Sequence, residues 1–238
     1  MAEISKVGGE QPIKAIVLLS GGLDSTTCLA GAARKYGAQN VAALSLHYGQ
    51  KHIKEIECAR KIAQHYGVMH IEHNIEKVFD FSDCSLLKGS KHSVPLENYA
   101  EQLKKTNGKP VSTYVPFRNG LFLAIAASIA ISLGAEALCY GAHADDAAGN
   151  AYPDCSEEFN KAINEAVYIG SGKELRVEAP FIGKPKAEVV KIGLGLGAPY
   201  NMTWSCYNGG EKPCGKCGTC IDRKKAFEIN GVKDPLEY

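Results

Sequence analysis

The 238-residue chain is predicted to be an α/β protein: a doubly wound, mainly parallel sheet followed by a small C-terminal metal-binding module. Short apolar runs alternate with helix-like segments up to about residue 200, a pattern that implies right-handed crossovers and helices on both faces of one sheet. Four of the nine cysteines crowd into residues 206–220. Ligands of such sheets bind beyond the C-terminal ends of the strands, so the loops after the strands are the candidate sites.

The predicted elements follow one another as strand, loop and helix. Residues 15–19 are fully apolar rather than alternating, which is typical of a central parallel strand. Gly37, Gly67 and Gly134 stand where the C-terminal caps of helices belong. We expect strands at 15–19, 41–46, 68–75, 137–140 and 175–178, and helices at 25–36, 53–66, 119–133, 157–167 and 186–194.

The predicted domains are an α/β domain over residues 1–203 and a four-cysteine module with a helix over residues 204–238. Residues 1–13 are expected to be flexible, and residues 76–113, polar and weakly periodic, to form a surface insertion. The most apolar segment, 121–133, is too short for the ~20 residues that span a membrane. The first residues do not resemble a signal peptide, so we expect a cytoplasmic protein.

The net charge disfavours long nucleic acids as partners. Lys and Arg number 27 against 26 for Asp and Glu, so no global positive field attracts a polyanion. Small-molecule chemistry is the better expectation.

The segment "SGGLDS", residues 20–25, leaves the first strand and opens the first helix. Free N–H groups and the helix dipole at such a loop favour phosphate. Gly21 and Gly22 let the backbone approach an anion, and the hydroxyls of Ser20 and Ser25 can donate to it. Asp24 would repel bare phosphate, so it implies a bridging Mg²⁺ or a helix cap. Phosphate binding is favoured over a plain glycine turn capped by aspartate.

The cysteine cluster has the spacing C-x7-C-x2-C-x2-C. Four thiolates at such spacing form a closed tetrahedral zinc site with no open position, which makes the site structural. A sulfur relay through Cys214 and Cys217, or an iron–sulfur cluster, is the alternative. Zinc is favoured because a relay leaves the remaining cysteines unexplained.

The loop "SGGLDS" resembles the pyrophosphate-binding loop (PP-loop) of the N-type ATP pyrophosphatases. With "HYGQKH", "VPFRNG", "YPDC", "APFIGKPKAEVVKIGLGLGAPYNMTWSCY" and the cysteines in this order, residues 14–225 resemble the 7-cyano-7-deazaguanine synthase family. The resemblance implies a ligase of queuosine precursor biosynthesis that forms carbon–nitrogen bonds. ATP with Mg²⁺ would adenylate 7-carboxy-7-deazaguanine, ammonia would give the amide, and a second activation would give the nitrile. The resemblance also implies a homodimer, with no direct contact to nucleic acid or membrane.

The same resemblance assigns residues to the site, with Asp24, Ser25 and Arg118 in catalytic roles. The residues implied to bind ATP are Leu18, Leu19, Ser20, Gly21, Gly22, Leu23, Asp24, Ser25, Thr26, Thr27, His47, Tyr48 and Gln50. Those implied to bind the deazaguanine are Arg118, Asn119, Asp145, Asp146, Tyr152, Asp154 and Cys155. The ligands implied for one structural Zn²⁺ per chain are Cys206, Cys214, Cys217 and Cys220.

One segment departs from the family pattern. Residues 149–156 read "GNAYPDCS", where the family has glycine directly before Tyr-Pro-Asp-Cys and arginine after it. The alternative is therefore the same activation chemistry on a variant deazaguanine acid or with another amine acceptor. Thiolation of tRNA and a non-enzymatic nucleotide-binding zinc module are less favoured.

Overall fold

The computed structural model describes residues 12–238, and its strands form one all-parallel sheet in the order β3-β2-β1-β4-β5. The strands are β1 (Ala15–Leu18), β2 (Val41–His47), β3 (Met69–Asn74), β4 (Ala137–Cys139) and β5 (Arg176–Glu178). The predicted doubly wound sheet is confirmed, and each strand begins and ends within one residue of its expected bounds.

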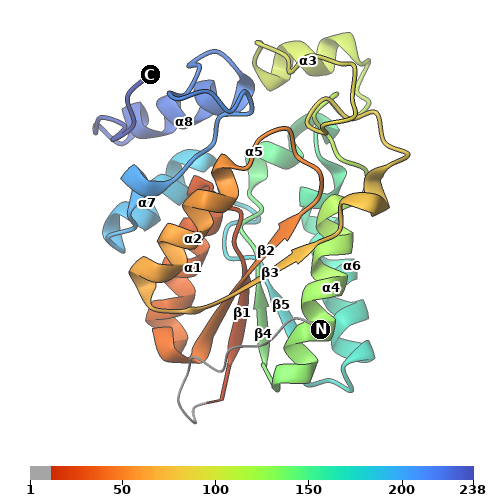
Figure 1. Ribbon diagram of the computed structural model, residues 1–238, viewed down its shortest axis with the longest axis vertical. Coiled ribbons are helices and arrows are strands. Elements are labelled where there is room, and N and C mark those ends of the chain that lie inside the picture. Colours follow the sequence, from red (N-terminus) through yellow and green to blue (C-terminus); the bar gives the residue numbers. More distant parts are fainter. Residues whose placement is uncertain (1–11) are drawn as a thin grey trace.

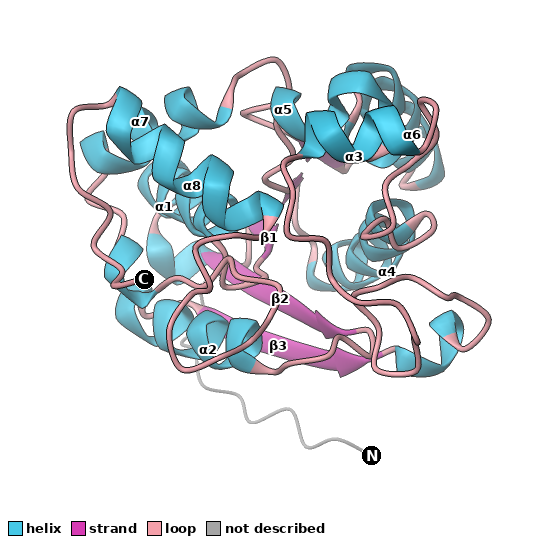
Figure 2. Ribbon diagram, turned by 90° about the horizontal axis from the view of Figure 1, so that it is seen from above, coloured by secondary structure: helices cyan, strands magenta, loops and turns pink. Residues whose placement is uncertain are grey.

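Helices cover both faces of the sheet. They are α1 (Leu23–Tyr36), α2 (Lys54–Tyr66), α3 (Tyr99–Lys105), α4 (Arg118–Leu133), α5 (Ala144–Ala147), α6 (Glu157–Gly170), α7 (Lys186–Gly195) and α8 (Gly218–Ile229). Seen from above, α1, α2, α7 and α8 lie on one side of the sheet and α4 and α6 on the other (Figure 2). Over residues 12–238, no helix is both long and apolar enough to cross a bilayer.

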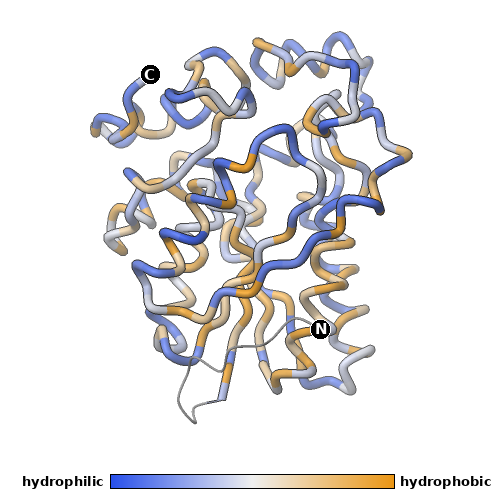
Figure 3. The backbone as a smooth tube through the Cα atoms, in the orientation of Figure 1, coloured by the Kyte–Doolittle hydropathy of each residue, from blue (hydrophilic) through white to orange (hydrophobic). Residues whose placement is uncertain are grey.

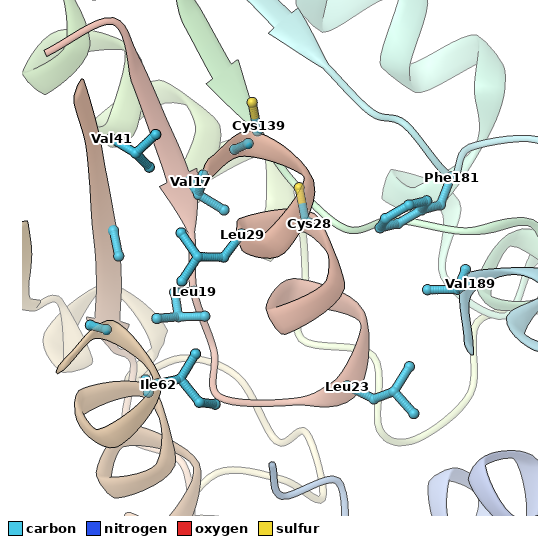
Figure 4. Packing of buried hydrophobic residues seen from close by; sticks show 14 of the residues in the cluster. Val17, Leu19, Leu23, Cys28, Leu29, Val41, Ile62, Cys139, Phe181 and Val189 are labelled. Atoms are coloured by element: carbon cyan, nitrogen blue, oxygen red, sulfur yellow. The ribbon is translucent and has the colours of Figure 1, made fainter. Parts of the chain in front are cut away.

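The core lies on both sides of the sheet because the strands are buried on both faces. In β1, Ala15 and Val17 belong to the cluster under α1, whereas Ile16 belongs to the cluster under α4. Figure 4 shows Cys28 and Leu29 of α1 pointing toward the strands. Hydrophobic residues follow the strands through the middle of the molecule (Figure 3).

The topology reverses direction next to β1. The chain runs outward from β1 to β2 and β3, and α4 then carries it back to β4 on the other side of β1. The loops after β1 and β4 therefore diverge, and a crevice forms where they separate. Helices α3, α5 and α8 lie at the end of the sheet toward which β2 and β3 point (Figure 1).

The insertion at 76–113 is folded onto the protein. It contains a 3-10 turn (Glu76–Phe79) and α3, and it buries Phe79, Leu86 and Leu87 against Tyr48. The segment therefore packs on the loop after β2 instead of standing free. Residues 1–11 of the predicted flexible N-terminus lie outside the described residues, and Ile13 belongs to the buried core. The division at residue 203 stays a prediction.

Candidate active site

The PP-loop is curved tightly by its own side chains. The Oγ atoms of Ser20 and Ser25 lie 3.0 Å apart, and Ser25 Oγ also donates to the carbonyl of Gly22 at 3.1 Å. Gly21 has a φ of +86°, and a Cβ there would overlap the carbonyl oxygen of Glu55. Glycine is required at position 21 because the loop presses against the first turn of α2.

Asp24 belongs to a group of charged side chains at the start of α1. Lys186 Nζ donates to Asp24 Oδ2 at 2.9 Å, and His143 Nε2 lies 3.7 Å from Asp24 Oδ1 and 3.3 Å from Asp146 Oδ2. Burial raises the pKa of Asp24, but Lys186 and His143 outweigh it and hold the pKa below the ordinary value. Asp24 Oδ1 is buried without a hydrogen-bond partner among residues 12–238. The site thus holds an ionised carboxylate with a free acceptor.

A cavity of about 210 Å³ opens above the PP-loop, at the C-terminal ends of β1, β2 and β4. Its apolar wall includes Leu44, Leu46 and Phe122, and its polar groups converge from the loops. Twelve of the predicted site residues line it: Leu18, Leu19, Ser20, Gly22, Asp24, Ser25, Tyr48, Gln50, Arg118, Asn119, Asp146 and Cys155. Apolar walls with a few convergent polar groups are typical of small-molecule sites.

Arg118 is the first residue of α4 and faces this cavity. Its Nη1 donates to the hydroxyl of Tyr48 at 3.2 Å, and the guanidinium lies 5.3 Å from the centre of the Tyr48 ring. It forms no ion pair with any residue from 12 to 238. Its remaining donors are therefore available to a carboxylate or phosphate.

Eight of the residues predicted to bind ATP or the deazaguanine do not line the cavity: Gly21, Leu23, Thr26, Thr27, His47, Asp145, Tyr152 and Asp154. Most are engaged elsewhere. In the PP-loop and α1, Leu23 belongs to the hydrophobic core. The hydroxyl of Thr26 donates to the carbonyl of Gly22, and that of Thr27 donates to the carbonyl of Leu23.

The other four serve neighbouring structure. His47 Nε2 lies 2.8 Å from Glu72 Oε2 on β3. Asp145 accepts from the backbone N–H of Lys186 at 2.8 Å, at the start of α7. Asp154 accepts from the N–H of Asn119 at 2.8 Å and so caps α4. The hydroxyl of Tyr152 lies 2.6 Å from Thr113 Oγ1, within hydrogen-bond distance.

The structure also brings in residues that the sequence analysis did not select. Lys186 and Glu55 line the cavity, and His143 pairs with the two carboxylates beside it. Lys186 follows β5 and opens α7, so its place after a strand is a signal that could have identified it. Glu55 carried no such signal, because α2 reaches the PP-loop only in the folded chain.

The four cysteines converge, with their Sγ atoms all within 4.8 Å of one another. A tetrahedral zinc site with Zn–S distances of about 2.3 Å needs sulfurs about 3.8 Å apart, which this cluster can provide. Backbone N–H groups already point at the sulfurs: those of Lys216 and Cys217 donate to Cys214 Sγ at 3.4 and 3.3 Å. The cluster can therefore hold a metal ion.

The cysteine module also forms one wall of the cavity. Trp204, Ser205, Tyr207 and Thr219 line it, and the backbone N–H of Trp204 donates to the carbonyl of Gly21 at 2.9 Å. A metal that orders this module therefore also supports the PP-loop.

Comparisons with known proteins agree with this arrangement. The family model described as "Queuosine biosynthesis protein QueC" matches residues 14–231. A 7-cyano-7-deazaguanine synthase of Archaeoglobus fulgidus is 44% identical over 225 residues, covering 94% of this chain and 90% of the relative. One of Caldicellulosiruptor saccharolyticus is 43% identical over 228 residues, covering 95% and 96%. The solved NMN synthetase from Francisella tularensis shares the fold alone, with a TM-score of 0.51 and 14% identity over 93% of this chain and 79% of that one.

Proposed function

Because this chain belongs to the family of queuosine biosynthesis protein QueC, we propose that it converts 7-carboxy-7-deazaguanine and ammonia to 7-cyano-7-deazaguanine at the expense of ATP, as a ligase that forms carbon–nitrogen bonds. The observation that carries the proposal is one cavity in which the PP-loop, Lys186 and Arg118 meet. The charges fit an anionic nucleotide and an anionic acid held side by side.

The chemistry needs an oxygen to be made into a good leaving group twice. A carboxylate oxygen attacks the α-phosphorus of ATP, and pyrophosphate departs. Ammonia then adds to the activated carbon, AMP leaves with that oxygen, and a proton is lost to give the amide. A second ATP adenylates the amide oxygen, and loss of AMP together with the N–H protons gives the nitrile. One site can serve both steps because each repeats the same activation.

The PP-loop and Lys186 are proposed to hold the phosphates. The N–H groups at the start of α1 and the ammonium of Lys186 face negative charge that grows on the departing pyrophosphate, where fixed donors are most effective. Asp24 and Asp146 would hold Mg²⁺, which would neutralise part of that charge when bound. The unpartnered Oδ1 of Asp24 fits this role.

Arg118 is proposed to hold the carboxylate of the deazaguanine in a bidentate grip. The rings of Tyr48 and Phe122 and the apolar wall offer a surface on which a flat heterocycle can pack. Asn119 and Cys155 also line the cavity and are proposed to contact the heterocycle.

The cysteine cluster is proposed to bind one structural Zn²⁺, since four thiolates leave no position open for water or substrate. Homodimer formation, the absence of direct nucleic-acid and membrane contacts, and the cytoplasmic location stay predictions.

The test is a mass-resolved assay with ATP, Mg²⁺, ammonium and 7-carboxy-7-deazaguanine. We expect AMP to form only when the acid is present, and the nitrile to appear after a transient amide. Asp24→Ala is expected to abolish AMP formation while the protein stays folded, whereas Asp80→Ala, an exposed position outside the cavity, is the matched control. ATP breakdown that requires tRNA instead of the free acid would favour thiolation and contradict the proposal.

A further inference from the structure

A second, very small cavity lies next to the main one. It is lined by Tyr48, Gln50, Lys51, His52, Glu55, Leu86 and Tyr207. Its volume is about 10 Å³, close to the space that one water molecule requires. Ammonia is of the same size and hydrogen-bonding character as water, so this chamber fits one molecule of the amine substrate.

A partition of four residues lies between the two cavities. Tyr48, Gln50, Glu55 and Tyr207 line both, so a molecule in the chamber lies directly behind the wall of the main site. Leu86 of the insertion also lines the chamber. The N–H of Lys51 donates to the carbonyl of Leu86 at 2.9 Å, and the Leu86 side chain is buried.

Glu55 is the one residue of this partition that carries a carboxyl group. It lies in the first turn of α2, and its backbone is pressed against Gly21 of the PP-loop. Within residues 12–238 its carboxylate has no ion-pair partner and no side-chain hydrogen bond. It is therefore free to bind a small cation that enters the chamber.

The surroundings of Glu55 raise the pKa of its carboxyl group toward neutral pH. Burial raises its pKa to about 7, and the positive charge of Arg118 offsets only part of that rise. The ionisable groups that face the partition and the chamber from the neighbouring elements are Tyr48, Lys51, His52, Arg118 and Tyr207. A carboxyl group of this kind can accept and release a proton near neutral pH.

Ammonium must lose a proton before its nitrogen can react. In neutral water ammonia is mainly present as ammonium, which has no lone pair with which to attack carbon. We propose that the chamber binds ammonium and that Glu55 takes one proton from it, releasing ammonia into the main cavity; this assignment rests on the proposed function. The nitrogen lone pair then forms the C–N bond, the C–O bond to AMP breaks, and the new amide nitrogen loses one further proton to solvent. The amide-to-nitrile step consumes no ammonia and does not use the chamber.

The experiment compares the two half-reactions in Glu55→Gln, which keeps the side-chain shape and removes the base. With the acid as substrate, we expect kcat/KM for total ammonium at pH 7 to fall about 100-fold or more, within the range of general-base effects. Between pH 7 and 8 the variant should regain activity about tenfold, in proportion to free ammonia. With the synthetic amide and ATP, nitrile formation should stay within about threefold of the parent protein. Glu57→Gln, exposed in the same turn of α2, is the matched control.

A second variant tests the chamber without touching the carboxylate. Leu86→Phe should fill it, raise KM for ammonium at least about tenfold and leave amide conversion unchanged. Normal ammonium kinetics in Glu55→Gln would overturn the proposal, and so would equal losses with acid and amide, which would place Glu55 in the ATP or deazaguanine site. If the parent protein forms AMP from neither acid nor amide, the proposed function itself fails.

Discussion

The buried ion pair between Arg223 and Asp234 anchors the cysteine module, and Arg223→Met should destabilise the protein strongly. Arg223 is 1% exposed. Its guanidinium makes two bonds to the carboxylate of Asp234, at 2.7 and 2.9 Å, and one each to Thr203 Oγ1 at 2.6 Å and the carbonyl of Tyr200 at 3.1 Å. These contacts tie α8 to the segment that leads into the cavity wall.

The expected loss follows from what the substitution leaves behind. Methionine fills much of the space, but the carboxylate of Asp234, with 6% of its side chain exposed, keeps only the hydroxyl of Tyr238 and the N–H of Leu236. Removing one partner of a buried pair costs about 3–5 kcal/mol, against a total stability of about 5–15 kcal/mol for a typical domain. Burial then raises the pKa of Asp234, since the arginine that held it below the ordinary value is gone. The loss should therefore shrink as the pH falls through this raised pKa and the carboxyl takes up a proton.

The assay is urea unfolding followed by fluorescence, because the chain has a single tryptophan, Trp204, which is buried at the edge of this module. The double variant Arg223→Met with Asp234→Asn removes both charges and should recover at least about 1 kcal/mol relative to the single variant. A loss below about 1 kcal/mol in Arg223→Met, or a double variant no more stable than the single one, would refute the reasoning.

Three further predictions concern the metal, the pH dependence and the loop. Cys217→Ser should lower the zinc content below the expected one ion per chain and expose Trp204, because a structural zinc site that loses one ligand loses much of its binding energy. Full zinc content in the variant would contradict this prediction. The hydrogen bonds from Arg60 hold the pKa of Glu72 at about 2, so Glu72→Gln should lower stability at pH 7, with the deficit fading as the pH falls from about 4.5 to 2; a constant deficit down to pH 2 argues against this cause. Gly21→Ala should reduce ATP turnover at least about tenfold, because its Cβ overlaps a carbonyl of α2 and its φ is positive. Gly31→Ala, with open space around it, is the control.

Much of the fold was predictable because its signals are local. Apolar runs such as residues 15–19 need only neighbours in the chain to indicate a buried strand, and Gly67 and Gly134 end α2 and α4 in the left-handed conformation that only glycine adopts easily. The short insertion helix α3 was missed, because seven residues show too little periodicity.

The candidate site likewise has some features that local sequence predicts and others that it does not. The PP-loop and the four cysteines are short segments with distinctive spacings. The cysteine sulfurs converge as the spacing predicts, and residues of the loop line the cavity. The type of a residue and its position after a strand predicted its place in the site less well. Asp145 and Asp154 have the right chemistry and the right loops, but each is used to cap a helix N-terminus, which satisfies buried backbone donors.

The sequence by itself determined the parallel α/β fold, the glycine loop after β1 and the group of four cysteines that could hold a metal, since the signals for each are local in the chain. Only the tertiary structure decided which side chains from distant parts of the sequence meet. Lys186 reaches Asp24 over 162 positions of sequence because α7 packs on α1. Glu55 reaches the cavity because α2 lies against the PP-loop, and the cysteine module becomes a wall of the site because α8 packs on α7. Such contacts depend on the packing of whole helices, which local periodicity does not specify.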